Sequence, residues 1–523
     1  MFFFIDIRFN TQERLEFWKL SRERKRGRGK TIEYSSFASC LLHILNCAIF
    51  DMTGEVLTLQ VGHCGNQMGK HFWSKILNEH GINKDGSSKI DNEDLASARE
   101  DDPSVFLRQI ETNKYTPRAI LFDMEPSSIN DTQNTLPGLF DERNVWISKD
   151  SLGAGNVWAD GYDYGTQHIE EMINMIDKEL DSTDNFEGFQ LLHSVAGGTG
   201  SGLGSQLLEM LSDRYYKKLT TTYSVFPSTE SDVVVQPYNT ILTLRRLIEN
   251  SDACIVFDNN SLMNLSSCVF RNSNTSFNDA NQLIASVMSA TTNSLRFPSY
   301  MYSSLSSIFS TIIPSPNLHF LVPSFTPFTT DFIPEAKNFK RKNSYDVILD
   351  LFDSKNSMFS GAQTPLFFEQ QQASYIAVWD SLQGNVDQSE CMRALLKAQQ
   401  RVNYVPWGSK TINLNIGKKS QYNKGGNSDC VTGLMLANST GIKPIFTQTC
   451  KNFDALFKRN AFVTKFENGK LFEDGFDEFK ISREIVEDVI QEYTLCDNTS
   501  YLDDILLGDE DDMMVGIHEG MQI

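Results

Sequence analysis

The stretch SVAGGTGSGLGS, residues 194–205, places five glycines between two apolar runs, FQLL at 189–192 and QLLEML at 206–211. The runs predict a buried strand before the glycines and an amphipathic helix after them. Glycine destabilises regular structure wherever the backbone does not require it, so we expect something to lie close against this loop. A strand, a glycine-rich loop and a helix form a site for anions, because free N–H groups and the positive end of the helix dipole meet there.

Strands and helices alternate on both sides of this loop. Apolar runs that predict strands recur at 56–61, 118–123, 189–196, 222–227 and 253–258. Apolar residues at helical spacing lie between them. This order predicts an α/β fold with a parallel sheet whose two faces are covered by helices. Ligands of such sheets bind at the carboxyl ends of the strands.

A second set of elements follows. A long helix without glycine or proline is expected at about 278–295. Three more runs predict strands of a second α/β domain, at 318–325, 374–380 and 411–417. Residues 446–495 are interpreted as two helices, with ENGKLFEDGFDEFK as the turn between them. The chain is therefore predicted to end in a helical hairpin.

The composition excludes several classes of function. The net charge of −20 argues against nucleic acid as the main partner, because phosphates repel an acidic surface. Nine cysteines without a C-x-x-C pair predict no zinc site and suit a reducing compartment. No run reaches the roughly 18 apolar residues of a membrane span. We therefore expect no membrane contact and a cytosolic or nuclear location.

The two ends of the chain differ from the rest. Residues 1–51 carry the basic cluster RERKRGRGK in an otherwise acidic protein. We expect a disordered arm or a misassigned start there, and a basic docking arm is the alternative. GRGKT at 27–31 mimics the end of a phosphate loop, but Arg24 stands where that motif needs its first glycine. The acidic stretch 498–523 is expected to be a disordered tail.

Four further loops contain small or polar residues next to predicted elements. They are GHCGNQMG at 62–69, DMEP at 123–126, GAGNVWADGY at 153–162 and SDVVVQPYN at 231–239. One glycine-rich loop is a weak signal, whereas five loops at one edge of a sheet indicate a ligand site. Within DMEP, Asp123 and Glu125 stand two residues apart, which suits Mg²⁺ held through water.

Two other interpretations of the glycine loop stay open at this point. A dinucleotide site requires G-x-G-x-x-G and an acidic residue about twenty positions later. The spacing here is G-x-G-x-G-x-G, and Lys217 and Lys218 stand near the acidic position. The other alternative is a flexible turn that binds nothing.

The loops resemble the nucleotide loops of the tubulin family. GHCGNQMG, AGGTGSGLGS, GAGNVWADGY and SDVVVQPYN carry this likeness, which runs from Met52 to about Tyr493. Within the family the chain is more similar to gamma-tubulins than to alpha or beta chains, through the loop AGGTGSGLGS, Gln236, YVPWG at 404–408 and SREIVEDVIQEY at 482–493. Its end, SYLDD, is similar to the tails of yeast gamma-tubulins.

The resemblance implies a tubulin-like arrangement of domains. Residues 52–258 would form a GTP-binding domain on the parallel sheet. Residues 259–445 would form the central helix and a second, intermediate α/β domain. Residues 446–497 would form the C-terminal helices, before the tail at 498–523.

The resemblance also implies a site for GTP or GDP. The residues it assigns to the phosphates and to the loops that close over the nucleotide are Cys64, Gly65, Gln67, Asn156, Ala196, Gly197, Gly198, Thr199, Gly200 and Ser201. The residues it assigns to the ribose and the base are Asp232, Gln236, Asn259, Phe277 and Asn281. Asp123 and Glu125 would lie near Mg²⁺.

The chemistry of the base-binding group agrees with this assignment. The amides of Asn259 and Asn281 offer a donor and an acceptor together, as a guanine edge requires. An aromatic ring stacked on a base contributes about 1–3 kcal/mol, which is the role implied for Phe277. Without the resemblance, Phe277 would be interpreted as an ordinary core aromatic.

Two departures from the family pattern bear on mechanism. His63 stands where the family usually has Gln, so its charge beside the phosphates would depend on pH. In alpha-tubulin, a loop after the central helix supplies an acid that activates water for GTP hydrolysis in the neighbouring subunit. Ser304 and Ser307 occupy those positions here, and no Asp or Glu occurs between Arg296 and Asp331. Serine is no general base without help, so we expect at most weak GTPase activity and no stimulation of a docked subunit.

This combination implies a terminal subunit that nucleates microtubules and caps their minus ends at the microtubule-organising centre, the spindle pole body of yeasts. The expected partners are gamma-tubulin complex proteins, alpha/beta-tubulin dimers and lateral copies of the same chain. A self-polymerising alpha/beta-type tubulin and a dinucleotide-dependent oxidoreductase are the alternatives. Tyr501, close to Asp503 and Asp504, is predicted as a phosphorylation site in the tail, with an unmodified tail as the alternative.

Overall fold

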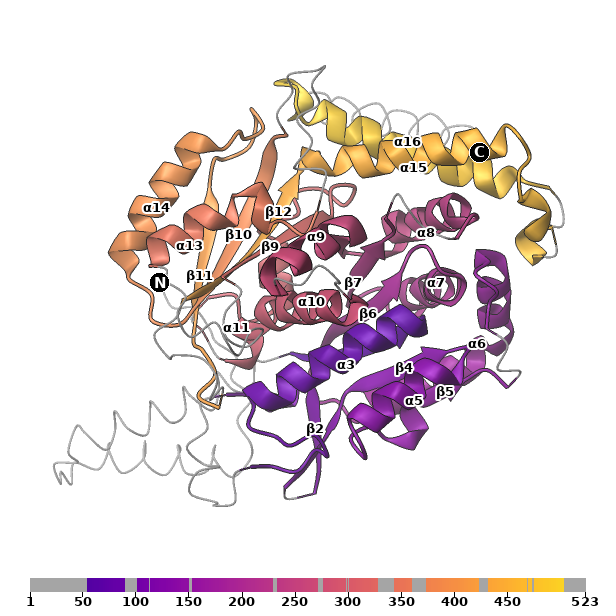
Figure 1. Cartoon of the computed structure of the whole chain (residues 1–523), viewed down its shortest axis with the longest axis horizontal. Helices are drawn as coiled ribbons and strands as arrows, with labels where there is room; N and C mark the ends of the chain where they lie inside the picture. Colours follow the sequence, from indigo (N-terminus) through magenta and orange to yellow (C-terminus); the bar gives the residue numbers. More distant parts are fainter. Residues whose placement is uncertain are drawn as a thin grey trace, which may run out of the picture. The chain divides into compact units, whose positions relative to one another are not determined.

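A ten-stranded sheet runs through the described part of the chain (Figure 1). The computed structural model describes residues 54–89, 101–111, 113–149, 153–228, 233–270, 276–297, 299, 301–327, 343–359, 373–422, 431–467, 469–472 and 475–502. The predicted N-terminal arm and the tail beyond residue 502 lie outside these ranges. No helix within them is long and apolar enough to span a bilayer.

Seven neighbouring strands of the sheet are parallel. In sheet order they are β5 (Val145–Ile147), β4 (Ala119–Asp123), β1 (Glu55–Val61), β6 (Phe186–Ser194), β7 (Leu219–Phe226), β8 (Ala253–Asp258) and β9 (Phe320–Thr326). All five runs predicted in the first part of the chain form strands, so the parallel sheet is confirmed. From β1 the chain adds strands on one side and then, from β6, on the other. The order therefore reverses between β1 and β6, which is where such sheets bind ligands.

Helices cover both faces of the parallel strands, as expected from the alternating sequence (Figure 1). One core is formed with α6 (Trp158–Leu180), α7 (Gly204–Arg214), α8 (Gln236–Asn250), α15 (Lys443–Phe457) and α16 (Asp477–Leu495). The other core is formed with α3 (Gly62–Glu79), α5 (Pro126–Thr135), α9 (Asn259–Phe270), α10 (Phe277–Thr291), α11 (Asn293–Arg296) and α12 (Leu305–Phe309). A separate hairpin, β2 (Leu107–Glu111) with β3 (Lys114–Pro117), lies outside the large sheet.

The predicted second set of strands continues the same sheet. β10 (Tyr375–Gln383) and β11 (Ile412–Gly417) were predicted, but β12 (Thr432–Ser439) was not. β12 pairs antiparallel with both β9 and β10, so it occupies the centre of this part although it comes last in the sequence. α13 (Ser344–Leu351) and α14 (Gln388–Arg401) cover one face of these strands. The short pairing of β8 with β9 joins the two parts.

Two helix boundaries differ from the prediction. The helix expected at 278–295 is interrupted at Thr292, so it forms α10 and the short α11. The predicted turn ENGKLFEDGFDEFK is too long at its end, because its last four residues are the first turn of α16. The helical pair α15 and α16 itself is confirmed, and Figure 1 shows the two helices side by side.

Tyr501 corrects the prediction of a disordered tail from residue 498. Its ring is buried and stacks on Trp407 with centroids 4.9 Å apart, and its hydroxyl donates to Glu492 at 2.5 Å. Trp407 in turn donates to the backbone oxygen of Cys496 at 2.9 Å. An aromatic contact and two hydrogen bonds thus fix the chain up to this residue. A kinase would reach the Tyr501 hydroxyl only after this contact opens.

Asp380 is the most unusual buried group of the sheet. It lies in β10 opposite Met435 and Leu414 of the neighbouring strands and is fully buried. Within the described residues neither carboxylate oxygen has a hydrogen-bond partner. Burial raises the pKa of Asp380 well above its ordinary value, because the charged form is poorly solvated there.

We expect Asp380→Asn to change how stability depends on pH. The folded pKa is raised, so the folded state holds the proton more tightly, and this stabilisation is lost as pH rises from about 4 through the folded pKa. Each unit of the shift corresponds to roughly 1.4 kcal/mol. Urea unfolding from pH 5 to 8 should show a falling stability for the unmodified chain and a flatter profile for the variant. The matched control, Asp346→Asn at an exposed position, should keep the slope, and an unchanged slope in Asp380→Asn would contradict the assignment.

Candidate functional site

The carboxyl ends of the parallel strands bring the five predicted loops to one edge of the sheet. Cross-strand pairing sets Val61 beside Phe122, Asp123 beside Ile147 and Ser194 beside Val225. The strands thus end within one or two residues of each other. The loop after β1 and the loop after β6 meet at the point where the strand order reverses. A Cβ on Gly62 of the first loop, where φ is +72°, would lie 2.9 Å from the Gly200 nitrogen of the second.

The glycine loop lies mainly against the protein's own backbone. A Cβ on Gly202 would approach the Tyr162 nitrogen of α6 to 2.7 Å, and one on Gly198 would lie 2.8 Å from the Val157 nitrogen. The expected close approach to the loop therefore comes, at these two glycines, from the protein itself, because α6 meets Gly202 and the loop before α6 meets Gly198. Gly197 differs, since a Cβ there would meet nothing nearer than the Ser194 hydroxyl at 3.4 Å. Among the described residues, nothing therefore approaches the Cβ position of Gly197 closely.

The hydroxyls of the glycine loop are oriented differently from one another. Ser201 is fully buried and donates to the carbonyl oxygen of Gly197, so its hydroxyl serves the loop itself in this structure. Thr199 is half-buried at the first residue of the turn that leads into α7. The backbone N–H groups of this turn and the positive end of the α7 helix dipole would both stabilise an anion.

Asn239 was not assigned from the sequence, although it belongs to the quoted motif SDVVVQPYN. Its side-chain nitrogen donates to the carbonyl oxygens of Asn156, at 2.8 Å, and Ala196, at 2.9 Å. Its side-chain oxygen accepts from the backbone nitrogen of Trp158 at 3.0 Å. One buried amide therefore joins the loop before α6 to the glycine loop. Nothing in the sequence distinguished this residue from its neighbour Gln236.

His193 is a second residue that the sequence analysis missed. It lies fully buried under the glycine loop, 3.1 Å from the Gly200 carbonyl oxygen through Nδ1 and 2.8 Å from the Ser224 hydroxyl through Nε2. Burial lowers the pKa of His193 to about 4, so the ring is neutral at pH 7. The carbonyl can only accept, which puts the ring proton on Nδ1. His193 therefore supports the loop from below as a neutral group.

The first loop opens α3 with polar side chains. Asn66 donates to the carbonyl oxygens of Gly62, at 3.1 Å, and Phe122, at 3.3 Å, which ties α3 to the end of β4. Cys64 is half-buried, and burial raises the pKa of its thiol to about 12, so it is a neutral group at pH 7. A Cβ on Gly65 would press on the Leu192 backbone, so this glycine is required by the packing of α3 on β6.

The two acids predicted near Mg²⁺ differ in exposure. Asp123 is only 2% exposed, accepts from the Ser128 hydroxyl and from the Glu125 nitrogen at 3.3 Å, and burial raises the pKa of its carboxyl group. Glu125 is exposed and its carboxylate lies over Gly153. No group of three or more His, Cys, Asp or Glu side chains in the described ranges forms a metal cage. The pair fits an ion that keeps most of its water better than one bound directly.

The residues predicted for the base and ribose occupy the starts of three helices. Phe277 begins α10 and is 61% exposed, which excludes the alternative of a core aromatic. Asn281, one turn later, is nearly buried and donates to Gln67 at 3.4 Å. Asn259 begins α9 and Gln236 begins α8. Asp232 lies outside the described residues.

The remaining predicted residue, Asn156, is exposed with a φ of +59°. The structure thus joins Gln67 to Asn281, and Asn156 to Ala196 through Asn239. Room beside Gly197 and an exposed ring at Phe277 fit a ligand with an anionic end and an aromatic end.

A carboxylate from β6 reaches α12 at the opposite edge of the sheet. Ser304 and Ser307 cap α12 reciprocally, with each side chain accepting from the other's backbone nitrogen. The sequence analysis expected no carboxylate at this surface, but Glu187, from the start of β6, accepts from the Ser306 nitrogen at 3.2 Å. Burial raises the pKa of the Glu187 carboxyl group. That expectation was wrong because it considered only residues close to α12 in sequence.

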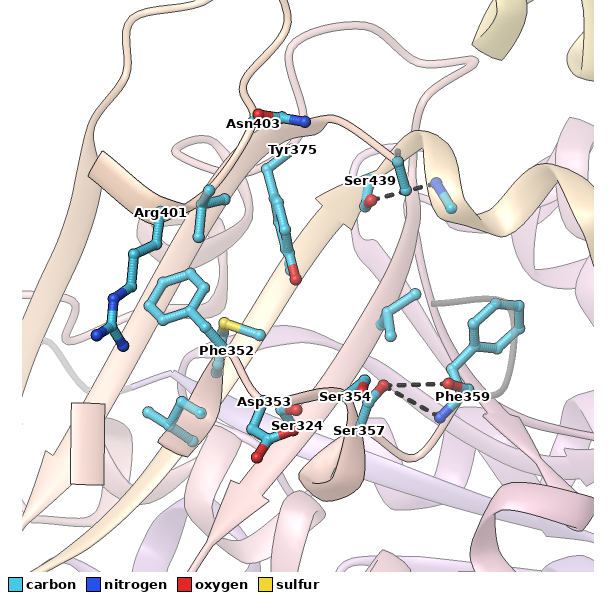
Figure 2. Close-up of a pocket in the computed structure, with 17 residues that line it drawn as sticks. Ser324, Phe352, Asp353, Ser354, Ser357, Phe359, Tyr375, Arg401, Asn403 and Ser439 are labelled. Carbon is cyan, nitrogen blue, oxygen red and sulfur yellow. Dashed lines mark hydrogen bonds between the residues drawn. The ribbon is translucent and has the colours of Figure 1, made fainter. Parts of the chain in front are cut away.

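A separate pocket lies on the second part of the sheet (Figure 2). Its volume is about 340 Å³, and it is lined from β9, β10 and β12 and the end of α13. Two of its hydroxyls have partners, since Ser357 bonds to the Phe359 backbone and Ser439 accepts from the Gly441 nitrogen (Figure 2), whereas the buried Ser324 hydroxyl has none among the described residues. None of the predicted nucleotide residues lines it.

Comparison with known proteins gives the class of this fold and site. A model of the Tubulin/FtsZ family GTPase domain matches residues 55–267, and the tubulin C-terminal domain matches residues 316–451. A GTPase domain of this family implies that the chain binds GTP or GDP.

Relatives narrow the assignment within that class. The chain is 60% identical to a tubulin gamma chain of Eremothecium gossypii, over 89% of this chain and 97% of that one. It is 53% identical to the tubulin gamma chain of Candida glabrata and 51% identical to that of Saccharomyces cerevisiae, over 89% of this chain and 98% and 97% of theirs. The chain belongs to the tubulin family, and within it to the gamma-tubulins.

The contrast between Gly197 and Gly202 gives a test of the phosphate site. We expect Gly197→Ala to weaken GTP binding more than tenfold, because its methyl group would enter the space left for an anion, while the melting temperature without nucleotide stays within about 2 °C. The matched variant Gly202→Ala should lower that melting temperature by several degrees, because its methyl group meets α6. Equal losses of stability in the two variants would show that Gly197 is also a packing glycine.

Proposed function

We propose that this chain nucleates microtubules and caps their minus ends, with GTP or GDP at the edge formed by the loops after β1 and β6. The observation that carries the proposal is the open cradle at Gly197 where the strand order reverses, on a chain similar along most of its length to gamma chains. The nucleotide edge would receive alpha-tubulin of the first dimer. Nucleation is then geometric, because subunits held in place remove the entropy of assembling a seed.

The nucleotide would lie along the edge from the glycine loop to the start of α10. The turn 197–201 would hold the phosphates, with Asn156 toward the terminal one and Cys64, Gly65 and Gln67 closing over them. Gln236 and Asp232 would face the ribose. Asn259 and Asn281 would read the guanine edge and Phe277 would stack on it, which its exposure supports.

Mg²⁺ would be held through water near the phosphates. Glu125 is the exposed acid of the pair, whereas Asp123 is tied to Ser128. The ion would neutralise phosphate charge, and the two carboxylates would orient its water shell. Asn66, which bonds to Phe122, fixes the backbone beside them.

The opposite edge would sit on gamma-tubulin complex proteins, and the sides would contact further copies of the chain. A cavity of about 380 Å³ at this edge is lined by residues such as Tyr216, Thr220 and Pro314. The Tyr216 side chain is 75% exposed, so a partner could contact its ring. The protein would act at the microtubule-organising centre, in yeasts the spindle pole body.

Hydrolysis of GTP would be slow and would not be stimulated in a subunit docked on α12. Ser304 and Ser307 are used as caps, and Glu187 is occupied by the Ser306 nitrogen of the same helix. Glu187 Oε2 is buried, so the burial that raises the pKa of this carboxyl group also keeps that oxygen from the water of a docked subunit. A GTPase assay of a tubulin subunit docked on α12 should give the same low rate for Glu187→Gln, and a further fall in that variant would identify Glu187 as a general base.

The proposed function is tested by seeding. The chain assembled with its complex proteins should shorten the lag of alpha/beta-tubulin polymerisation, and the chain alone should form few filaments with GTP. Abundant filaments of the pure chain in a sedimentation assay would support the self-polymerising alternative. Release of NAD or FAD, in place of a guanine nucleotide, from the denatured protein would support the oxidoreductase.

Phe277 gives a test of base stacking. We expect Phe277→Ala to weaken GTP and GDP binding about 5- to 150-fold, since stacking contributes about 1–3 kcal/mol. Thermal stability without nucleotide should change little because the ring is exposed. Titration of both nucleotides by calorimetry measures the effect, and Phe277→Trp should retain most of the affinity. Unchanged affinity in Phe277→Ala would remove Phe277 from the site.

A further inference from the structure

A chain of three polar side chains crosses from α3 to α10 beside the proposed nucleotide position. Gln67 Nε2 lies 3.0 Å from His63 Nε2, and Asn281 Nδ2 donates to Gln67 Oε1 at 3.4 Å. His63 stands at the start of α3, next to the glycine loop, and Asn281 stands one turn after Phe277. These three hydrogen-bonded side chains therefore connect the phosphate end of the site to its base end.

The orientation of the Gln67 amide sets the direction of the hydrogen bonds. An amide nitrogen only donates and an amide oxygen only accepts, so His63 Nε2 accepts from Gln67 and its ring proton is on Nδ1. Gln67 Oε1 then accepts from Asn281 Nδ2. This hydrogen bond orients the amide nitrogen of Asn281 toward α3. The Asn281 oxygen is left as the acceptor for a ligand.

Turning the Gln67 amide around would keep both hydrogen bonds but would change the group that Asn281 offers to a ligand. If His63 Nε2 donated, Gln67 Oε1 would turn toward it and Gln67 Nε2 would donate to the Asn281 oxygen. Asn281 would then offer only N–H groups to the ligand. Guanine carries two donor groups, N1–H and the 2-amino group, on its pairing edge, whereas adenine carries an acceptor at N1 and no amino group at position 2. The arrangement in the structure is the one that matches guanine.

Phe277 and Asn281 are four residues apart on α10, so they share one face of the helix. A base stacked on the exposed Phe277 ring therefore has its edge within reach of Asn281. Gln67 is half-buried between the two helices. Long hydrogen bonds in ligand-free sites commonly shorten when the ligand binds, which suits the 3.4 Å separation.

We propose that Gln67 is a positioning residue for guanine selectivity, which fixes the orientation of the Asn281 amide with His63 as its anchor. This inference rests on the proposed binding of guanine at Asn281. It differs from a role for Gln67 in closing over the phosphates or ribose, because such a contact would hold every nucleoside triphosphate equally.

The test compares GTP with ATP, which carry the same ribose and triphosphate. The ratio of the two dissociation constants cancels any effect of Gln67 on those shared groups. Gln67→Met removes both bonds at nearly constant volume, and we expect it to lower the preference for GTP about three- to tenfold, the range for losing one hydrogen bond. Gln67→Glu retains an acceptor for Asn281, so it should weaken both triphosphates by charge repulsion but keep the preference near that of the unmodified chain.

Two further variants separate positioning from general damage. Asn278→Ala removes a bond between the same two helices, to His71, and should leave the preference unchanged. Gln67→Met should lower the preference no further when Asn281→Ala is already present. An equal fall in that background, or equal weakening of GTP and ATP in Gln67→Met alone, would overturn the inference. No preference for GTP over ATP in the unmodified chain would instead overturn the proposed guanine site, and melting curves identify any variant that fails to fold.

Discussion

The close approach of α6 to the glycine loop is the constraint on which the rest of the site depends. Gly202 lies so close to Tyr162 and Gly198 so close to Val157 that a side chain on either would collide with backbone. The Asn239 amide then joins the two loops from below by three hydrogen bonds. Because backbone atoms cannot move aside as a flexible side chain can, these loops form one rigid piece. The cradle at Gly197 is thus built before any nucleotide arrives, and little binding energy is lost in ordering it.

Much of the fold follows from short-range pattern. β8 was predicted because a strand buried on both faces forms a nearly continuous apolar run, here ACIVFD. β12 was missed because TGLMLANS mixes small polar residues into the run, and its burial comes from β9 and β10 on either side. β5, with three residues, is too short to leave a pattern. In each case the deciding information is a neighbour distant in sequence.

In the site, too, some features follow from local sequence and others depend on residues distant in sequence. Residue types and loop positions were predictable, since the carboxyl ends of parallel strands meet at one edge. Side-chain direction was not, because the hydroxyl of Ser201 and the carboxylate of Asp123 take partners that only the folded backbone supplies. Glu187 is the clearest example of a partner that local sequence does not reveal. It reaches α12 from a strand more than a hundred residues earlier, so an argument confined to the sequence around α12 could not include it.

The helices that begin at the nucleotide edge also end together. α10 starts with Phe277 and continues through α11 to Arg296, which is fully buried and pairs with Glu79 at the end of α3 at 2.7 Å. The loop toward α12 follows directly. Two rigid helices joined at both ends, by Gln67 with Asn281 and by Glu79 with Arg296, transmit a displacement because packed cores do not absorb it. If complex proteins dock beside α12, linkage requires that any change they cause in nucleotide affinity equals the change that the nucleotide causes in theirs. A nucleator of this design would then hold its nucleotide edge in one shape because its opposite edge is already occupied.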